Sequence, residues 1–237
     1  SHEIQKIEEI DQEAVVGLLD QDALKEFRDR ALNPEHPVVR GTAQNPDIYF
    51  QAREASNPFY DAIPAVVEEY LGKLGEITGR NYGLFDYYGA PDADRVVVAM
   101  GSSTEAIREG IDYLTEKGEK VGLISVHLYR PFSAKHFLSV MPKTAKRVCV
   151  LDRTKEPGAG GEPLYLDVKD VLYGTENQPL VVGGRYGLSS KDFTPAQVLA
   201  VYQNLSLPSP RNGFTVGIVD DITFTSLPLG EEIPMGG

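Results

Sequence analysis

The sequence predicts a three-layer α/β/α domain with a mostly parallel five-stranded sheet, and with extended segments at both ends of the chain. Three observations favour this fold class. From residue 94 onward, short apolar runs of strand length alternate with stretches of helix length. The apolar runs are nearly continuous, which is typical of parallel strands buried on both faces. The composition, with 41% hydrophobic and 24% charged residues, is that of a globular chain.

Each predicted strand is an apolar run that ends in a turn or loop. Helices fill the intervals, and right-handed crossovers between parallel strands follow from that order. The predicted strands are Arg95–Met100, Lys120–Leu128, Arg147–Asp152, Pro179–Gly183 and Thr215–Val219. The predicted helices are Thr104–Lys117, Ser133–Met141, Leu164–Tyr173 and a last one that runs to about Leu205, with Thr194 as its N-cap and Pro195 at its first position.

The residues before this domain contain less regular structure. A helix is predicted over Gln21–Leu32, and the stretch Pro37–Pro46 is expected to be irregular. A long amphipathic helix is predicted to begin at Asn57, as its N-cap, and to end at Gly79, a typical glycine stop. Pro64 is expected either to kink this helix or to mark its true start.

Charge and cysteine content exclude several classes of protein. With 23 basic and 35 acidic residues, the chain has a net charge of −12, so it offers no basic surface to nucleic acid or to an anionic membrane. No apolar run approaches the roughly 18 residues of a membrane span, and no signal-peptide pattern opens the chain. The one cysteine, Cys149, lies inside an apolar run. One thiol cannot form an internal disulfide, a structural zinc site or an iron–sulfur cluster, and a reducing cytoplasmic compartment is expected.

Three loops are predicted at the carboxyl edge of the sheet, where open parallel sheets place their ligands. The first has two interpretations. Ser102 and Glu105 have capping-box spacing and could simply cap the next helix. Alternatively, free backbone N–H groups and hydroxyls could hold a phosphate. The candidate anion-binding residues are Gly101, Ser102, Ser103, Thr104 and, from the third loop, Arg185.

The second and third loops follow the third and fourth predicted strands. Asp152–Glu162 mixes cations, carboxylates and glycines, but it lacks the G-x-G-x-x-G and Walker spacings. It could cradle a phosphate or a carboxylate, and we favour docking onto another domain. The candidate docking residues are Arg153, Lys155, Gly158, Gly160 and Gly161. The third loop, Gly183–Lys191, is explained by a turn that feeds the last helix, with Arg185 as an alternative anion contact.

The sequence contains no recognised catalytic or metal-binding pattern. The four histidines show no metal-binding i, i+4 pair, and there is no G-x-S-x-G elbow. His127 and His136 could approach each other in space, although ordinary surface imidazoles explain both. Asp220 and Asp221 are interpreted as carboxylates that cap the turn after the fifth strand.

Several stretches taken together resemble one family over essentially the whole chain. The set is similar to the pyruvate:ferredoxin (flavodoxin) oxidoreductases, large enzymes that use thiamine diphosphate and iron–sulfur clusters. The resembling stretches are Ser1–Ile7, Arg40–Gln51, Asn57–Tyr60, Gly101–Glu105, Tyr129–Phe132, Leu151–Gly158 and Gly184–Ser190.

The resemblance implies a segment of such an enzyme. Residues 1–56 would be the tail of a preceding domain and a crossover segment, and 57–93 a long helix and linker. Residues 94–222 would be an α/β/α domain similar to the carboxy-terminal domain of transketolases, followed by a linker over 223–237. The parent would oxidatively decarboxylate pyruvate with coenzyme A, using thiamine diphosphate, magnesium and [4Fe–4S] clusters. Its partners would be its other domains, a dimer mate, and ferredoxin or flavodoxin.

The parts that this chemistry needs are not found in the sequence. [4Fe–4S] clusters need several cysteine thiolates, and no Gly-Asp-Gly motif exists to hold magnesium and a diphosphate. We therefore predict no catalytic residue, no metal site and no resident cofactor, and expect the isolated chain to be inactive. The leading hypothesis is a non-catalytic docking domain. The alternative is a domain that binds a small anionic ligand, such as a coenzyme or nucleotide phosphate, at the three loops.

Overall fold

The computed structural model describes residues 7–39, 41 and 43–229. Three parts of the resembling stretches, residues 1–6, 40 and 42, lie outside the described residues, as do residues 230–237 of the predicted linker. The described residues fall into two compact units, one that ends at Tyr82 and one that begins at Gly83. Every strand of the sheet belongs to the second unit.

Four helices joined by irregular segments make up the described residues of the first unit. Asp11 and Asp20 cap the first two helices, each carboxylate accepting a hydrogen bond from a backbone N–H of the first turn. Asn45 and Pro46 begin a helix at the end of the stretch predicted to be irregular, because Pro is favoured at a first helical position as well as in loops. The four helices are α1 (Gln12–Gly17), α2 (Gln21–Asp29), α3 (Pro46–Glu54) and α4 (Asn57–Thr78).

The long helix α4 confirms the predicted span with one correction. Its N-cap is Ser56 rather than Asn57, and the helix continues through Pro64. It ends where Gly79 adopts a left-handed φ of 69° and donates its N–H to the carbonyl of Gly75 at 2.8 Å. None of the described residues of this unit is fully buried, and the apolar stripe of α4 is half-buried except at Val66 and Ile77, which are exposed.

The second unit is a three-layer α/β/α domain, which confirms the predicted fold class. Its sheet order is β1-β3-β2-β4-β5-β6, and every neighbouring pair is parallel except β1 with β3. The strands are β1 (Phe85–Gly89), β2 (Arg95–Met100), β3 (Val121–Val126), β4 (Arg147–Asp152), β5 (Leu180–Arg185) and β6 (Phe214–Thr215).

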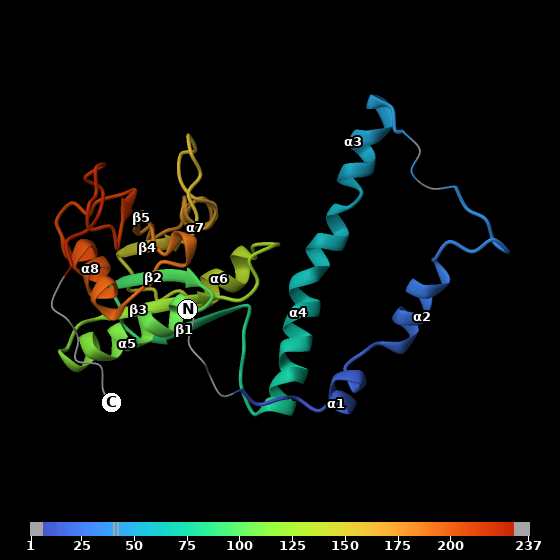
Figure 1. Cartoon of the computed structure of the whole chain (residues 1–237), viewed down its shortest axis with the longest axis horizontal. Helices are drawn as coiled ribbons and strands as arrows, with labels where there is room; N and C mark the ends of the chain where they lie inside the picture. The colour runs from blue at the N-terminus through green and yellow to red at the C-terminus, as the bar shows by residue number, and fades with distance from the viewer. Residues whose placement is uncertain (1–6, 40, 42, 230–237) are drawn as a thin grey trace. The chain divides into compact units, whose positions relative to one another are not determined.

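Helices cover both faces of this sheet (Figure 1). One layer packs against β3, β2 and β4, and the opposite layer packs against β1, β4 and β5. The first layer is α5 (Ser103–Glu116) and α8 (Pro195–Ser206), and the second is α6 (Ala134–Val140) and α7 (Pro163–Leu172). A short 3₁₀ helix, Leu188–Ser190, precedes α8.

Two strand predictions were wrong. The sheet has six strands because β1, with the sequence Phe-Asp-Tyr-Tyr-Gly, joins it in the antiparallel sense. An edge strand needs no continuous apolar run, so this segment lacked the pattern used to find the others. The predicted strand Thr215–Val219 is reduced to Phe214–Thr215, since Gly217 turns the chain with a φ of 87° and Val219 is exposed.

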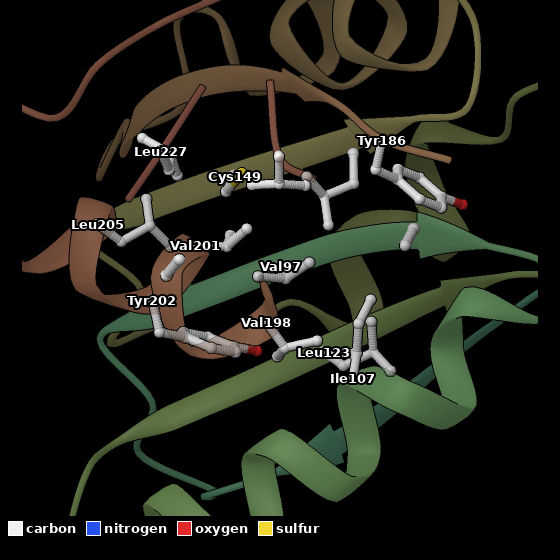
Figure 2. Close-up of a cluster of buried hydrophobic side chains, with 14 of the residues drawn as sticks. Val97, Ile107, Leu123, Cys149, Tyr186, Val198, Val201, Tyr202, Leu205 and Leu227 are labelled. Carbon is white, nitrogen blue, oxygen red and sulfur yellow. The ribbon is translucent and has the colours of Figure 1, made fainter. Parts of the chain in front are cut away.

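The main core lies between the sheet and the α5–α8 layer (Figure 2). Cys149 is fully buried there, among apolar side chains from β2, β3 and α8. Gly110 of α5 allows a close approach to α8, because a Cβ at this position would lie 2.6 Å from a methyl carbon of Val198. The labelled core residues in Figure 2 are Val97, Ile107, Leu123, Cys149, Tyr186, Val198, Val201, Tyr202, Leu205 and Leu227.

Candidate functional site

The three predicted loops meet at one edge of the sheet. The strands β2, β4 and β5 are neighbours in that order and run parallel, so their carboxyl ends lie side by side. The direction in which successive strands are added to the sheet reverses at β2, since β3 pairs with one side of β2 and β4 with the other. This is the position at which open α/β sheets commonly bind ligands.

A hydrogen bond joins the first loop to the third. The hydroxyl of Tyr186 donates to the Oγ of Ser103 at 2.8 Å, and both side chains are buried. Burial raises the pKa of Tyr186 above its ordinary value. Next to Ser103, the Oγ1 of Thr104 donates to the carbonyl of Gly101 at 2.8 Å. Two of the three predicted anion-binding hydroxyls are therefore already engaged within the protein.

The predicted capping box is wrong. Ser102 occupies the N-cap position of α5, but its backbone is helical, with a φ of −62° and a ψ of −18°, and its side chain makes no capping hydrogen bond. Capping side chains reach the first turn from an extended backbone, which this residue does not have. Glu105 instead lies 3.8 Å from the guanidinium of Arg108.

Asp152 ties the end of β4 to the start of α7. Its two carboxylate oxygens accept the backbone N–H groups of Leu164 and Tyr165, both at 3.0 Å, and the side chain is buried. Burial raises the pKa of this carboxyl, while the two N–H groups act in the opposite direction. Sequence reasoning missed this role, because an N-cap is sought next to its helix and Asp152 lies eleven residues before Pro163.

A buried carboxylate also occupies the predicted docking loop. Glu162 lies 3.4 Å from a guanidinium nitrogen of Arg185 and 3.8 Å from the Nζ of Lys155. A second nitrogen of Arg185 donates to the carbonyl of Gly213 at 2.8 Å. Arg185 as an anion contact stays a prediction, and an incoming anion would have to compete with Glu162 for it.

The middle of the second loop projects from this edge (Figure 1, yellow). Its base is fixed by Arg153, whose Nε donates to the carbonyl of Gly187 at 2.7 Å. Beyond it, Lys155, Gly158 and Gly160 are exposed, and Gly158 has a left-handed φ of 81°. At Gly161, by contrast, a Cβ would lie 2.3 Å from the ring of Tyr165. Arg153 thus holds the base of the loop, and the candidate docking residues Lys155, Gly158 and Gly160 are accessible to another surface.

His127 and His136, which the sequence suggested could approach each other, have separate partners. His127 pairs through Nε2 with the carboxylate of Asp86 at 3.0 Å, whereas the Nδ1 of His136 lies 2.6 Å from the Oγ of Ser133. Within the part of the chain that the structure describes, no group of three or more His, Cys, Asp or Glu side chains could hold a metal ion.

Neither cofactor implied by the family resemblance fits these residues. Burial raises the pKa of the Cys149 thiol well above its ordinary value, and no second cysteine exists to share a cluster. For thiamine diphosphate and its magnesium ion, the sequence lacks the Gly-Asp-Gly motif.

A cavity lies at the opposite edge of the sheet, with a volume of about 1040 Å³. The two arginines that line it already have partners within the protein. Arg95 pairs with Asp94 and Glu119, and Arg147 donates to two carbonyls at the carboxyl end of α8. This cavity is therefore lined by internal ion pairs and helix-end contacts. Among the described helices, none combines the length and apolar character that crossing a membrane requires.

Comparison with known proteins assigns both units to one kind of protein. The family model "Pyruvate:ferredoxin oxidoreductase core domain II" matches residues 93–198. The model "Pyruvate flavodoxin/ferredoxin oxidoreductase, thiamine diP-bdg" matches residues 1–71. A pyruvate-flavodoxin oxidoreductase of Enterobacter agglomerans is 60% identical over 231 residues, which cover 98% of this chain and 20% of the relative. A pyruvate:ferredoxin oxidoreductase of Moorella thermoacetica is 61% identical over 233 residues, with the same coverage.

The chain thus spans about one fifth of the length of these relatives. Among solved structures, a 2-oxoglutarate:ferredoxin oxidoreductase from Magnetococcus marinus matches 55% of this chain and 21% of its own, with 18% identity and a TM-score of 0.38. A likeness at that level carries no argument about the site.

Proposed function

This chain corresponds to a segment of the pyruvate:ferredoxin (flavodoxin) oxidoreductases, and on that premise we propose that it is a non-catalytic structural and docking domain of such an enzyme. In this proposal the parent enzyme oxidatively decarboxylates pyruvate with coenzyme A in the cytoplasm. It yields acetyl-CoA, CO₂ and reduced ferredoxin or flavodoxin. The domain's partners are the other domains of the parent and its dimer mate.

The observation that carries the proposal is the single thiol. Electron transfer through [4Fe–4S] clusters requires several cysteine ligands for each cluster, and this chain has only Cys149, fully buried in the core. In this proposal the clusters are held elsewhere in the parent, and so are thiamine diphosphate and magnesium, for which this sequence has no Gly-Asp-Gly motif. The Asp152 and Glu162 carboxylates, which a search for acid–base groups would find first, are engaged in capping α7 and in pairing with Arg185.

The exposed surfaces support a docking role. The described residues of the helical unit fully bury none of their apolar side chains, and Val66 and Ile77 of the amphipathic helix α4 are exposed, so this helix could use a covering surface. The loop of residues 154–160 offers a second exposed surface at the edge of the sheet. We assign residues 1–56 to the tail of a preceding domain, 57–93 to the long helix and linker, 94–222 to the α/β/α domain and 223–237 to a linker.

Activity of the purified chain tests the proposal. With pyruvate, thiamine diphosphate, magnesium and coenzyme A, we expect the 237-residue chain to give no pyruvate-dependent reduction of a viologen dye. The full-length parent, assayed under the same conditions, is the positive control. Turnover by the isolated chain would refute the proposed role.

Calorimetry tests the alternative of an anion-binding domain. The chain would be titrated with coenzyme A, thiamine diphosphate and nucleotides. Under the docking proposal we expect no saturable binding, because Ser103 and Arg185 already have partners. Binding that is lost in S102A, S103A or R185M would instead assign the carboxyl edge of the sheet to a small anionic ligand.

A further inference from the structure

The segment that follows β6 exposes three large apolar side chains close together in sequence. Val219, Ile222 and Phe224 are 92%, 89% and 82% exposed. We refer to residues 218–226 as the apolar loop. Folded domains seldom expose several large apolar residues within so few positions unless the surface contacts another protein surface.

The tip of the apolar loop is held by one carboxylate. Asp221 accepts the backbone N–H of Thr223 at 2.9 Å, the Oγ1–H of the same residue at 2.6 Å and the N–H of Ser226. These hydrogen bonds lower the pKa of Asp221 to about 2, so it is ionised at neutral pH. Of the two carboxylates predicted to cap this turn, Asp220 and Asp221, the side chain of Asp221 accepts these hydrogen bonds, although β6 ends earlier than predicted.

The C-terminal end of the apolar loop is attached to β6. The N–H of Thr215 donates to the carbonyl of Thr225 at 3.0 Å, and the N–H of Leu227 donates back to Thr215 at 2.8 Å. The guanidinium of Arg211 donates to the carbonyl of Phe224 at 2.6 Å. Leu227 is buried in the main core (Figure 2). The loop is therefore an ordered extension of the domain.

Phe224 sits in a strained conformation. Its φ of 57° lies in the left-handed region, which costs about 1–2 kcal/mol for a residue with a Cβ. Glycine or asparagine would suit this position better. The side chain gains little from burial within this unit, since it is mostly exposed, so folding of the unit alone does not explain a phenylalanine here.

We propose that the apolar loop is a preorganised contact that inserts Ile222 and Phe224 into an apolar socket on another domain of the full-length oxidoreductase. We name another domain of the same protein as the partner because about four fifths of the length of each relative lies outside the segment that this chain matches. The socket would be apolar because it receives Ile222 and Phe224, while the carboxylate of the neighbouring Asp221 is engaged by the N–H groups of its own loop. The exposed Asp220, beside Val219, fits a cation at the rim. The inference rests on the proposed docking role and names one surface that performs it.

Thiol labelling of I222C tests this contact. Cys149 is buried, so the thiol of I222C is the accessible one among the described residues of this chain. Peptide-resolved mass spectrometry would follow maleimide labelling in the isolated chain and in the full-length protein. We expect labelling at least about tenfold slower in the full-length protein. E176C, on an exposed turn far from the loop in sequence, is the matched control, and we expect its rate to change less than about twofold.

F224G separates docking from local strain. Removing the Cβ relieves the left-handed backbone, so we expect the isolated chain to become more stable to heat. In the full-length protein we expect F224G to weaken the contact instead, so that the thiol of I222C is labelled faster with F224G than without it. Equal labelling rates in the two proteins, or stabilisation of both by F224G, would overturn the contact. That result would leave the proposed docking role standing if the isolated chain is inactive, whereas viologen reduction by the isolated chain would refute the docking role itself.

Discussion

The phenolic hydroxyl of Tyr186 donates a hydrogen bond to Ser103 at 2.8 Å, although the two residues are separated by 83 positions in the sequence. The bond is buried at the edge of the sheet where the loops after β2 and β5 meet. It uses a hydroxyl that the sequence offered as an anion contact. The loops at this edge are therefore joined to one another as parts of a structural framework.

A double-mutant cycle on this pair is expected to show coupling. We expect Y186F and S103A each to lower the free energy of unfolding by about 1 kcal/mol. The double variant should lose less than the sum, with a coupling energy of about 1 kcal/mol measured by urea denaturation. Y202F, which removes a buried hydrogen bond to the carbonyl of Gly122, is the control that should add independently to S103A. Full additivity of Y186F and S103A would show that the hydrogen bond contributes nothing.

The Arg185–Glu162 pair is expected to be structural. R185M leaves the buried carboxylate of Glu162 with only the more distant Lys155, and we expect it to cost about 3–5 kcal/mol in unfolding free energy. Neutralising the carboxylate as well, in E162Q/R185M, should recover most of that loss. If R185M leaves stability unchanged, the guanidinium is available to a ligand, and the alternative of an anion site gains support.

The pH dependence of the apolar loop follows from Asp221. Its pKa in the folded chain is lowered from 3.8 to about 2, first by the hydroxyl of Thr223 and then by the N–H of Ser226. A lowered pKa stabilises the fold above the unfolded value and loses this contribution as the pH falls through the folded one. We expect the protection of the Thr223 and Ser226 amides against hydrogen exchange, measured relative to their intrinsic exchange rates, to fall as the pH is lowered from 3.8 to about 2. D221N should remove this dependence, and an NMR titration midpoint near 3.8 for Asp221 would contradict it.

Close packing of α5 on α8 predicts the effect of G110A. The added Cβ would meet the side chain of Val198, and we expect a loss of about 1–3 kcal/mol despite the better helix propensity of alanine. V198A in the same chain should relieve most of the loss. G72A in α4 is the matched control, because nothing lies within 4 Å of its new Cβ, and it should stabilise by about 0.5–1 kcal/mol. Equal effects of G110A and G72A in thermal denaturation would refute the close contact.

The thiol of Cys149 is expected to be inert in the folded chain. It is fully buried, and burial raises its pKa, so little thiolate forms at neutral pH. We expect labelling by a disulfide reagent to occur only as fast as the domain unfolds, and to become immediate in denaturant. Rapid labelling under native conditions would contradict the buried position in β4.

The sequence by itself determined the local elements and the limits on chemistry. Continuous apolar runs such as Arg95–Met100 specify buried parallel strands, because their pattern depends on neighbours in sequence alone. The count of one cysteine limited the redox role just as directly, since ligand number is a property of composition. The glycine that stops α4 was found for the same reason, as only the local backbone needs its left-handed φ.

The tertiary structure alone decided the contacts between distant segments. Asp152 caps a helix that begins eleven residues later, and Tyr186 reaches Ser103, because strand order brings the ends of β2, β4 and β5 together. Ser102 failed to cap because its backbone is already helical, which residue spacing does not encode. Such pairings depend on register and on the path of the chain in space, and those are fixed only when the whole sheet assembles.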